Sequence, residues 1–194
     1  MPITLINPTS SEWLNQVLDN FDEFLLDHAA NERKASSMAM SMVAHYPDKP
    51  KLVAAMIDLA LEELNHFRQV FRLSCERGLK LADDQKDPYV NDLHKHMRRQ
   101  SKKTNEYLLD RLLAAAVIET RGAERFTLLA ENLADPQLQT FYATLAKSEF
   151  NHGDLFVNLA HCYFSSEQVT ERLANWLAIE DTAMQTLSIR ARLH

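Results

Sequence analysis

Apolar residues recur along most of the chain at steps of three and four, the period of one face of an α-helix. Prolines, capping residues and polar segments divide this pattern into separate helices. The predicted core helices span about 20–46, 51–78, 104–134 and 136–164, and an outer helix spans about 166–190. A capping sequence at residues 9–12 predicts a short helix before them. We therefore expect a single all-α domain over residues 1–194, a four-helix bundle with additional N-terminal and C-terminal helices.

The ends of the predicted helices have the residue types that favour helix termini. Pro50 stands at the start of the second core helix, where its missing N–H costs nothing. Gly78 is placed to cap the end of the same helix. Asp135 and Pro136 predict the N-cap and first position of the fourth core helix.

The composition agrees with a helical fold. With 3 Gly and 6 Pro in 194 residues, the chain has few of the turn residues that a sheet protein needs. No apolar run is long enough to span a membrane, so we expect a cytoplasmic protein with no membrane partner. Cys75 and Cys162 are too few for a disulfide framework, and we expect them to be buried, reduced thiols.

Each predicted core stripe has a glutamate near its middle, and two stripes have a Glu-x-x-His pair. The residues are Glu32, Glu63, His66, Glu119, Glu149 and His152. Chance alone gives about 0.6 Glu-x-x-His matches in a chain of this composition, so one match would mean little. Here two matches occur, and each follows a stripe glutamate at nearly the same separation. The chain therefore reads as two copies of one helical hairpin.

Buried carboxylates predict a metal site. An isolated charge in a core loses its hydration and must be paired or coordinate a metal, and four converging carboxylates would also repel one another. Two divalent cations remove both problems, and the ligand set is that of ferritin-like di-iron carboxylate proteins. Carboxylate-rich sites with two imidazoles suit iron or manganese better than zinc, and iron adds the ability to reduce O₂.

Two further residues lie close to these ligands in the sequence. Glu124 is the alternative to Glu119, but it falls outside the apolar stripe. We expect Glu124 to support the ligands or to form a salt bridge. His28 lies one turn before Glu32 and either supports the site or is a hydrogen-bonded core histidine.

Small residues accompany the predicted ligands and leave two structural interpretations open. Either they allow close helix packing, or they leave a cavity beside the metals for a substrate. These residues are Ala29, Ala35, Ala39, Ala115, Ala116 and Gly122.

Four segments resemble those of the bacterial tRNA 2-methylthio-N6-isopentenyladenosine hydroxylases. They are DHAANERKA (27–35), EELNHF (62–67), IETRGAERF (118–126) and SEFNH (148–152). The similarity extends over about residues 14–160. It implies an O₂-dependent di-iron monooxygenase that hydroxylates the isopentenyl side chain of the modified adenosine next to the anticodon. It further implies that the six glutamates and histidines bind two iron ions, and that a reductase supplies external electrons.

A basic segment is the candidate tRNA-binding surface in an otherwise acidic chain of net charge −6. Clustered Lys and Arg residues can follow a phosphate backbone, although a solvated helix face gives the same pattern. Arg33 and Lys34 flank a predicted ligand and either extend this surface or pair with nearby carboxylates. The basic residues of the segment are Lys95, Arg98, Arg99, Lys102 and Lys103.

Other functions fit the same ligand pattern. The main alternative is a ferritin-like ferroxidase that handles iron. A manganese catalase-like enzyme and a radical-generating reductase subunit using Tyr142 are two more, and a helical bundle without catalysis is the last. We expect a monomer or small oligomer.

Overall fold

The computed structural model describes residues 3–81, 83, 85–97 and 105–194, and this part of the chain forms helices and no strand. The predicted all-α class is therefore confirmed. Two compact units can be distinguished: one comprises Met1–Leu14, Lys86–Ile189 and His194, the other Asn15–Gln85 and Arg190–Leu193. The helices are α1 (Ser11–Asp19), α2 (Phe21–His45), α3 (Pro50–Glu76), α4 (Pro88–Lys95), α5 (Asn105–Asn132), α6 (Pro136–Tyr163) and α7 (Ser166–Thr186).

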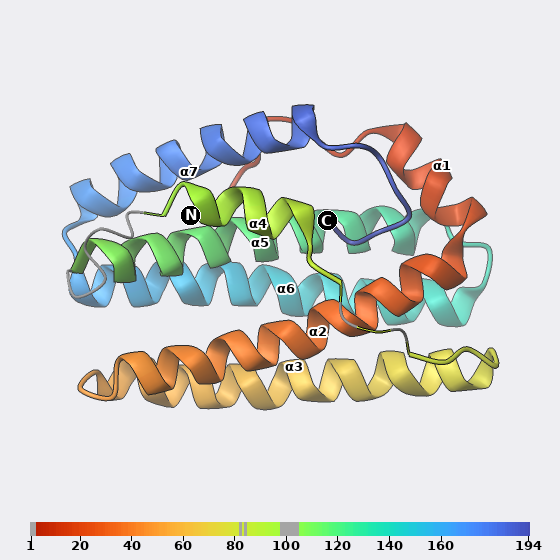
Figure 1. Cartoon of the computed structure of the whole chain (residues 1–194), viewed down its shortest axis with the longest axis horizontal. Helices are drawn as coiled ribbons and strands as arrows, with labels where there is room; N and C mark the ends of the chain where they lie inside the picture. The colour runs from red at the N-terminus through yellow and green to blue at the C-terminus, as the bar shows by residue number, and fades with distance from the viewer. Residues whose placement is uncertain (1–2, 82, 84, 98–104) are drawn as a thin grey trace. The chain divides into compact units, whose positions relative to one another are not determined.

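The unit of residues 15–85 is a helical hairpin. Figure 1 shows α2 and α3 side by side and antiparallel. The Ser36 hydroxyl donates a hydrogen bond of 2.8 Å to the Ala60 carbonyl and so joins the two helices at mid-length. Apolar side chains of both helices are fully buried, as the stripes predicted. Those with no exposed surface include Phe24, Leu25, Met42, Leu52, Met56 and Val70.

The other unit is built on a second hairpin, α5 and α6, against which α7 packs. The two hairpin helices approach closely at Gly153, where an added Cβ would lie 3.1 Å from Thr120 Oγ1 and 3.4 Å from the Ala116 carbonyl oxygen. Glycine at this position therefore lets α6 lie directly against α5. Helix α7 buries Trp176, and α4 buries Tyr89.

The helix ends follow the predicted capping at Asp135 and Gly78, and the end of α7 differs from its prediction. Asp135 accepts a hydrogen bond from the Gln137 N–H at the start of α6. Gly78 has φ 73° and ends α3, with the Leu79 N–H bonded to the Ser74 carbonyl. Helix α7 stops at Thr186, before the predicted end near residue 190.

The early end of α7 has a visible cause in the segment that follows it. The Leu193 N–H donates to the Asp27 carboxylate at 2.9 Å, and the Arg192 guanidinium donates to the Gln85 side-chain oxygen at 2.7 Å. These hydrogen bonds hold the backbone of the tail in a non-helical path. Tertiary contacts thus override the local helical preference of the sequence.

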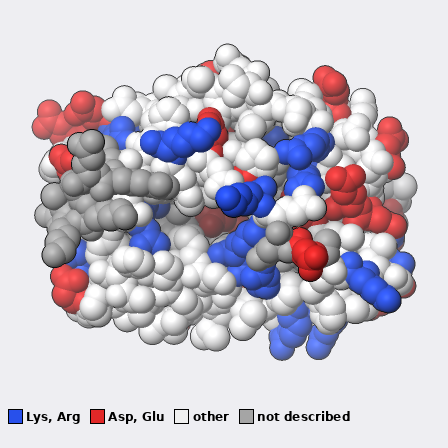
Figure 2. Space-filling view, in the orientation of Figure 1, with Lys and Arg blue, Asp and Glu red and all other residues white. Residues whose placement is uncertain are grey.

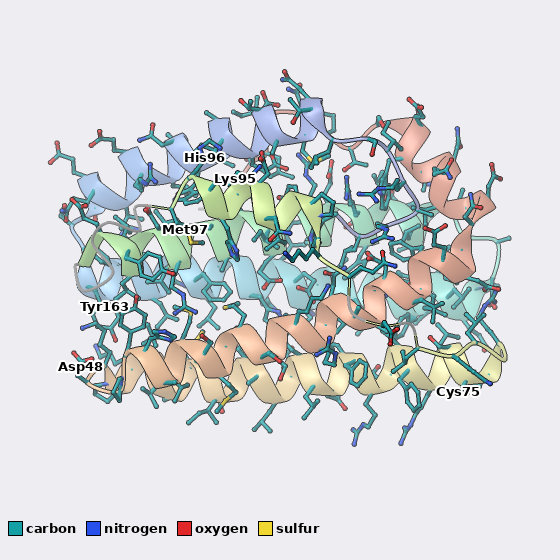
Figure 3. The ribbon with its side chains drawn as sticks, viewed as in Figure 1. Asp48, Cys75, Lys95, His96, Met97 and Tyr163 are labelled. Atoms are coloured by element: carbon teal, nitrogen blue, oxygen red, sulfur yellow. The ribbon has the colours of Figure 1, made fainter. Side chains whose placement is uncertain are left out.

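The expectation of buried cysteines was wrong, because Cys75 and Cys162 are both free and exposed. Figure 3 labels Cys75 near the end of α3. Within the described residues, none of the helices has the length and apolar content of a membrane span.

The two helical glycines of α5 and α6 predict opposite responses to substitution. Gly153→Leu inserts a side chain where even a Cβ is crowded, and we expect a loss of about 3 kcal/mol in unfolding free energy. Gly122→Ala is the matched control, because an added Cβ there meets no heavy atom within 4 Å. It should gain about 0.5 to 1 kcal/mol from helix propensity. Urea denaturation of both variants tests the close packing, and equal stabilities would contradict it.

Asp87 gives a prediction for acid stability. Its carboxylate lies 3.4 Å from Nδ1 of His194, and the His194 ring stacks on Tyr89. Burial alone raises the pKa of Asp87, but His194 and the N–H groups of α4 lower it from 3.8 to about 2. This carboxylate therefore stabilises the fold above about pH 4, and the stabilisation is lost as the pH falls toward 2.

Asp87→Asn keeps a capping side chain and removes the charge. We expect the variant to be about 2 kcal/mol less stable than the wild type at pH 7, with the difference disappearing near pH 2. Urea denaturation at a series of pH values measures this, and a difference that does not change with pH would contradict the ionic contribution.

Candidate metal centre

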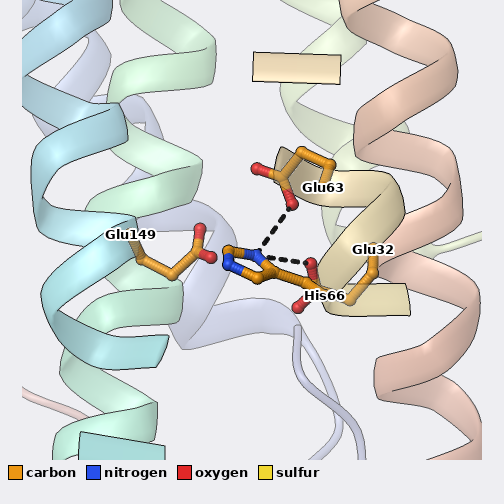
Figure 4. A group of neighbouring side chains, drawn as sticks. All are labelled: Glu32, Glu63, His66 and Glu149. Carbon is orange, nitrogen blue, oxygen red and sulfur yellow. Dashed lines mark ion pairs between the residues drawn. The ribbon is translucent and has the colours of Figure 1, made fainter. Parts of the chain in front are cut away.

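The helix pair α2 and α3 brings three predicted ligands together. Figure 4 shows the His66 ring facing the carboxylates of Glu32 and Glu63, and His66 Nδ1 lies 3.5 Å from an oxygen of each. One ligand atom from each of the three residues lies within 4.8 Å of the others. All three side chains are buried. The i, i+3 spacing of Glu63 and His66 places both on one face of α3, as predicted.

The protonation of this triplet shows how the chain manages two buried carboxylates without a metal. Burial alone raises the pKa of Glu32, but hydrogen bonds from His28 and His66 outweigh it and hold the pKa below its usual range. Burial alone lowers the pKa of His66, whereas hydrogen bonds to Glu32 and Glu63 raise it to about 9. A proton on His66 therefore offsets part of the negative charge, and a metal ion bound there would replace it.

His28 is fully buried and orients Glu32. Its Nε2 lies 2.6 Å from Glu32 Oε1. Because the ionised carboxylate can only accept, His28 Nε2 must carry the hydrogen of this bond. The second oxygen of Glu32 is the one that faces His66. This is the arrangement expected of a residue that orients a metal ligand by a hydrogen bond to the oxygen that does not face the metal site.

The helix pair α5 and α6 brings the other three predicted ligands together. Glu149 Oε2 and His152 Nδ1 are 3.5 Å apart on one face of α6. Glu119 of α5 has a carboxylate oxygen within 4.8 Å of ligand atoms of both residues. All three side chains are buried, so this triplet repeats the Glu and Glu-x-x-His composition of the first.

The donor set of each triplet fits a divalent cation of intermediate hardness. Two carboxylates and one imidazole offer oxygen and nitrogen ligands and no thiolate, a combination that suits iron or manganese. Two negative charges per triplet would balance one such ion. The residues present are therefore suitable for one divalent metal ion per triplet.

Glu124, the alternative to Glu119, takes part in a different cluster. Its oxygens accept hydrogen bonds of 2.7 Å from the N–H and hydroxyl of Thr9, and Arg121 Nη1 lies 2.6 Å from Oε2. The Arg121 guanidinium also binds both oxygens of the fully buried Glu180. Glu124 thus forms the salt bridge that was one of its two predicted roles, and Glu119 is the α5 glutamate placed with Glu149 and His152.

The small residues near the ligands are buried on their helices, apart from the half-buried Ala35. Gly122, one turn after Glu119, has open space where a Cβ would be. Gly153, which follows His152, has no such space, because an added Cβ would lie close to the Thr120 side chain. Sequence reasoning missed this second glycine, although its place next to a predicted ligand was a usable signal.

Of the predicted tRNA-binding residues, Arg98, Arg99, Lys102 and Lys103 lie outside the described part of the chain. Lys95 is exposed at the end of α4, where Figure 3 labels it, and its Nζ lies 2.7 Å from Asp92 Oδ1. Lys34 donates to the Gln85 carbonyl at 2.8 Å. Figure 2 shows Lys and Arg interspersed with Asp and Glu on the face that it draws. The role of these residues in tRNA binding stays a prediction.

Comparison with known proteins gives this ligand pattern a context. Residues 3–194 match the family described as tRNA-(MS2IO6A)-hydroxylase (MiaE). The chain belongs to the MiaE family. It is 34% identical over 187 residues to the tRNA 2-(methylsulfanyl)-N(6)-isopentenyladenosine(37) hydroxylase of Pseudomonas putida, covering 96% of this chain and 89% of that protein. The resemblance stated from the sequence is therefore confirmed.

Two further relatives of this MiaE-family chain extend the comparison. The hydroxylase of the same name from Salmonella typhimurium is 31% identical over 168 residues, which cover 87% of this chain and 60% of that protein. A solved structure, protein 43 with aldehyde deformylating oxygenase activity from Synechococcus, is 37% identical with a TM-score of 0.92, covering 98% of this chain and 94% of that one. The predicted ferritin-like all-α fold is confirmed by this match.

Glu63→Gln tests the ligand assignment in the MiaE-family chain. The substitution keeps the shape of the side chain but removes the charge that a cation requires, so we expect iron affinity to fall at least about tenfold while helicity is retained. Glu76→Gln, at the exposed end of the same helix, is the control and should bind iron like the wild type. Iron titration with circular dichroism measures both. Wild-type affinity in Glu63→Gln would remove Glu63 from the ligand set.

Proposed function

We propose that this MiaE-family protein holds two iron ions in one centre formed by its two ligand triplets. We further propose that it hydroxylates the isopentenyl side chain of 2-methylthio-N6-isopentenyladenosine in tRNA, next to the anticodon. The observation that carries the proposal is the repeated, buried Glu and Glu-x-x-His triplet in a chain matching this family over residues 3–194. When bound, the iron pair supplies the activation of O₂.

The chain's own residues have separable tasks in this proposal. Glu32, Glu63 and His66 bind one side of the centre, and Glu119, Glu149 and His152 bind the other. Their four carboxylates balance the charge of two Fe(II) ions. His28 holds Glu32 in one orientation through its 2.6 Å hydrogen bond. The burial of all six ligands excludes water from the place where the C–H bond reacts.

The proposed reaction requires electrons from outside the protein. Hydroxylation of one C–H bond by O₂ places one oxygen atom in the product and reduces the other to water, which consumes two electrons and two protons. We propose a reductase as the donor, and the cytoplasm, where tRNA is modified, as the place of action. The target base must leave its stacked position to reach a buried site, as base-modifying enzymes generally require.

A second candidate is oxygenation of an aldehyde. It is favoured by one observation, the 37% identity to a Synechococcus protein with aldehyde deformylating oxygenase activity. Such a reaction would differ from the first in its substrate, an aldehyde in place of a nucleoside in RNA. The two functions are therefore distinguished by substrate and product.

The deciding experiment is mass-spectrometric nucleoside analysis of 2-methylthio-isopentenylated tRNA incubated with iron-loaded protein, O₂ and a reducing system. We expect one added oxygen on the isopentenyl adenosine. Glu149→Ala should lose the product together with iron, since it removes a buried ligand. Glu171→Ala, an exposed glutamate on α7, is the control and should retain the product.

The same iron-loaded protein is incubated in parallel with a fatty aldehyde. No oxygenated nucleoside in the presence of two bound iron ions and efficient reduction would contradict the hydroxylase. Release of formate from the aldehyde under those conditions would establish the second candidate in its place.

A further inference from the structure

Helix α3 has a row of apolar side chains on its exposed surface. Ile57, Leu61, Leu64 and Phe71 are 41 to 63% exposed, although each is a residue type that usually packs in a core. They are separate from the buried stripe of the same helix that contains Glu63 and His66. An exposed apolar row of this length on one helix is typical of an interaction surface.

The exposed row has the spacing of a coiled-coil seam. With the exposed residues Ala54, Arg68 and Cys75 included, it runs through residues 54, 57, 61, 64, 68, 71 and 75, at alternating steps of three and four. This is the a/d pattern by which one helix packs along another. The seam covers 21 residue steps, or roughly 32 Å of helix. The geometry therefore points to a helical partner that lies along α3.

The charges in and beside the seam indicate which helix that partner is. Asp58 and Glu62 are exposed in the N-terminal half of α3, and Arg68 and Arg72 are exposed in its C-terminal half. A second α3 in antiparallel orientation, related by a two-fold axis at Asn65, would place Asp58 opposite Arg72. The same axis would place Glu62 opposite Arg68. Each pair occurs twice under the two-fold symmetry.

A parallel arrangement of two α3 helices would instead place equal charges opposite each other, which is unfavourable. Arg68 lies about one turn from the proposed axis, and its guanidinium donates a hydrogen bond to the Asn65 side-chain oxygen. The seam and its charges are thus self-complementary in one orientation only. Self-complementarity of a single patch is the defining property of a two-fold symmetric interface.

We propose that the exposed face of α3, defined by Ile57, Leu61, Leu64 and Phe71 with its four flanking charges, binds the same face of a second copy of this chain. The two α3 helices lie antiparallel across a two-fold axis at Asn65. A single helix seam is small for a protein interface, so the dimer is weak and forms in the micromolar range. The interface is independent of the metal ligands, which lie on the buried face of α3.

Sedimentation velocity of the full chain over a concentration series tests the dimer. We expect the wild type to dimerise with increasing concentration, and D58R/E62R to raise the dissociation constant about 100-fold by opposing like charges. R68E/R72E should have the same effect. An equimolar mixture of the two variants should dimerise again, because an all-basic face then meets an all-acidic one. Circular dichroism of each variant verifies its fold.

The orientation is tested by cross-linking with a short bismaleimide in a Cys162→Ser background. Antiparallel packing about Asn65 places residue 54 of one copy opposite residue 76 of the other, next to Cys75, so Ala54→Cys should cross-link to the native Cys75. Without Ala54→Cys, the two Cys75 thiols should be too far apart to cross-link. A parallel dimer would give the reverse result and overturn the proposal.

Two outcomes of the sedimentation experiment would also overturn it. One is a wild-type chain that stays monomeric up to about 100 µM. The other is a dimer that persists unchanged in D58R/E62R and R68E/R72E, which would place the interface elsewhere. A wild-type monomer would leave a different protein as the occupant of the α3 face.

Discussion

The structure depends on the burial of four carboxylates whose charge must be compensated inside the protein. In the α2 and α3 pair, Glu32 and Glu63 share the imidazole of His66, and the pKa of His66 is raised to about 9 as a result. Buried charge of this kind persists only where something compensates it, either a proton or a metal ion. The long helices, each with a ligand at mid-length, and the fully buried His28 behind Glu32 follow from the need to hold these groups in place.

A second buried cluster in the protein shows what complete compensation looks like. Arg121 binds Glu180 through two hydrogen bonds and also reaches Glu124, Thr9 and the Asn7 carbonyl. Its guanidinium thus has a partner for every donor, and the acids around it are matched by cations of the chain itself. The ligand triplets differ because acid exceeds base in each. This excess is what distinguishes a site built for a cation from a structural salt bridge.

The sequence predicted the helices and the grouping of ligands because both follow from periodicity. A Glu and a His three residues apart on an apolar stripe must share the buried face of a helix, whatever surrounds it. Features that depend on tertiary contacts were missed. The end of α7 and the exposure of Cys75 each depend on which segment lies alongside. The exposed seam of α3 has the same three-and-four spacing as the buried stripe of that helix. The sequence alone therefore does not show that a second face is also apolar.

The central claim is that the two triplets form one di-iron centre, and the most direct measurement is low-temperature Mössbauer spectroscopy of protein loaded with iron-57 and oxidised. Two iron ions that share bridging carboxylates couple magnetically, so the account predicts two iron ions per chain and a spectrum of quadrupole doublets without magnetic splitting. Two magnetically isolated ferric ions, or a single iron per chain, would contradict it. Either result would mean that the triplets act as separate sites.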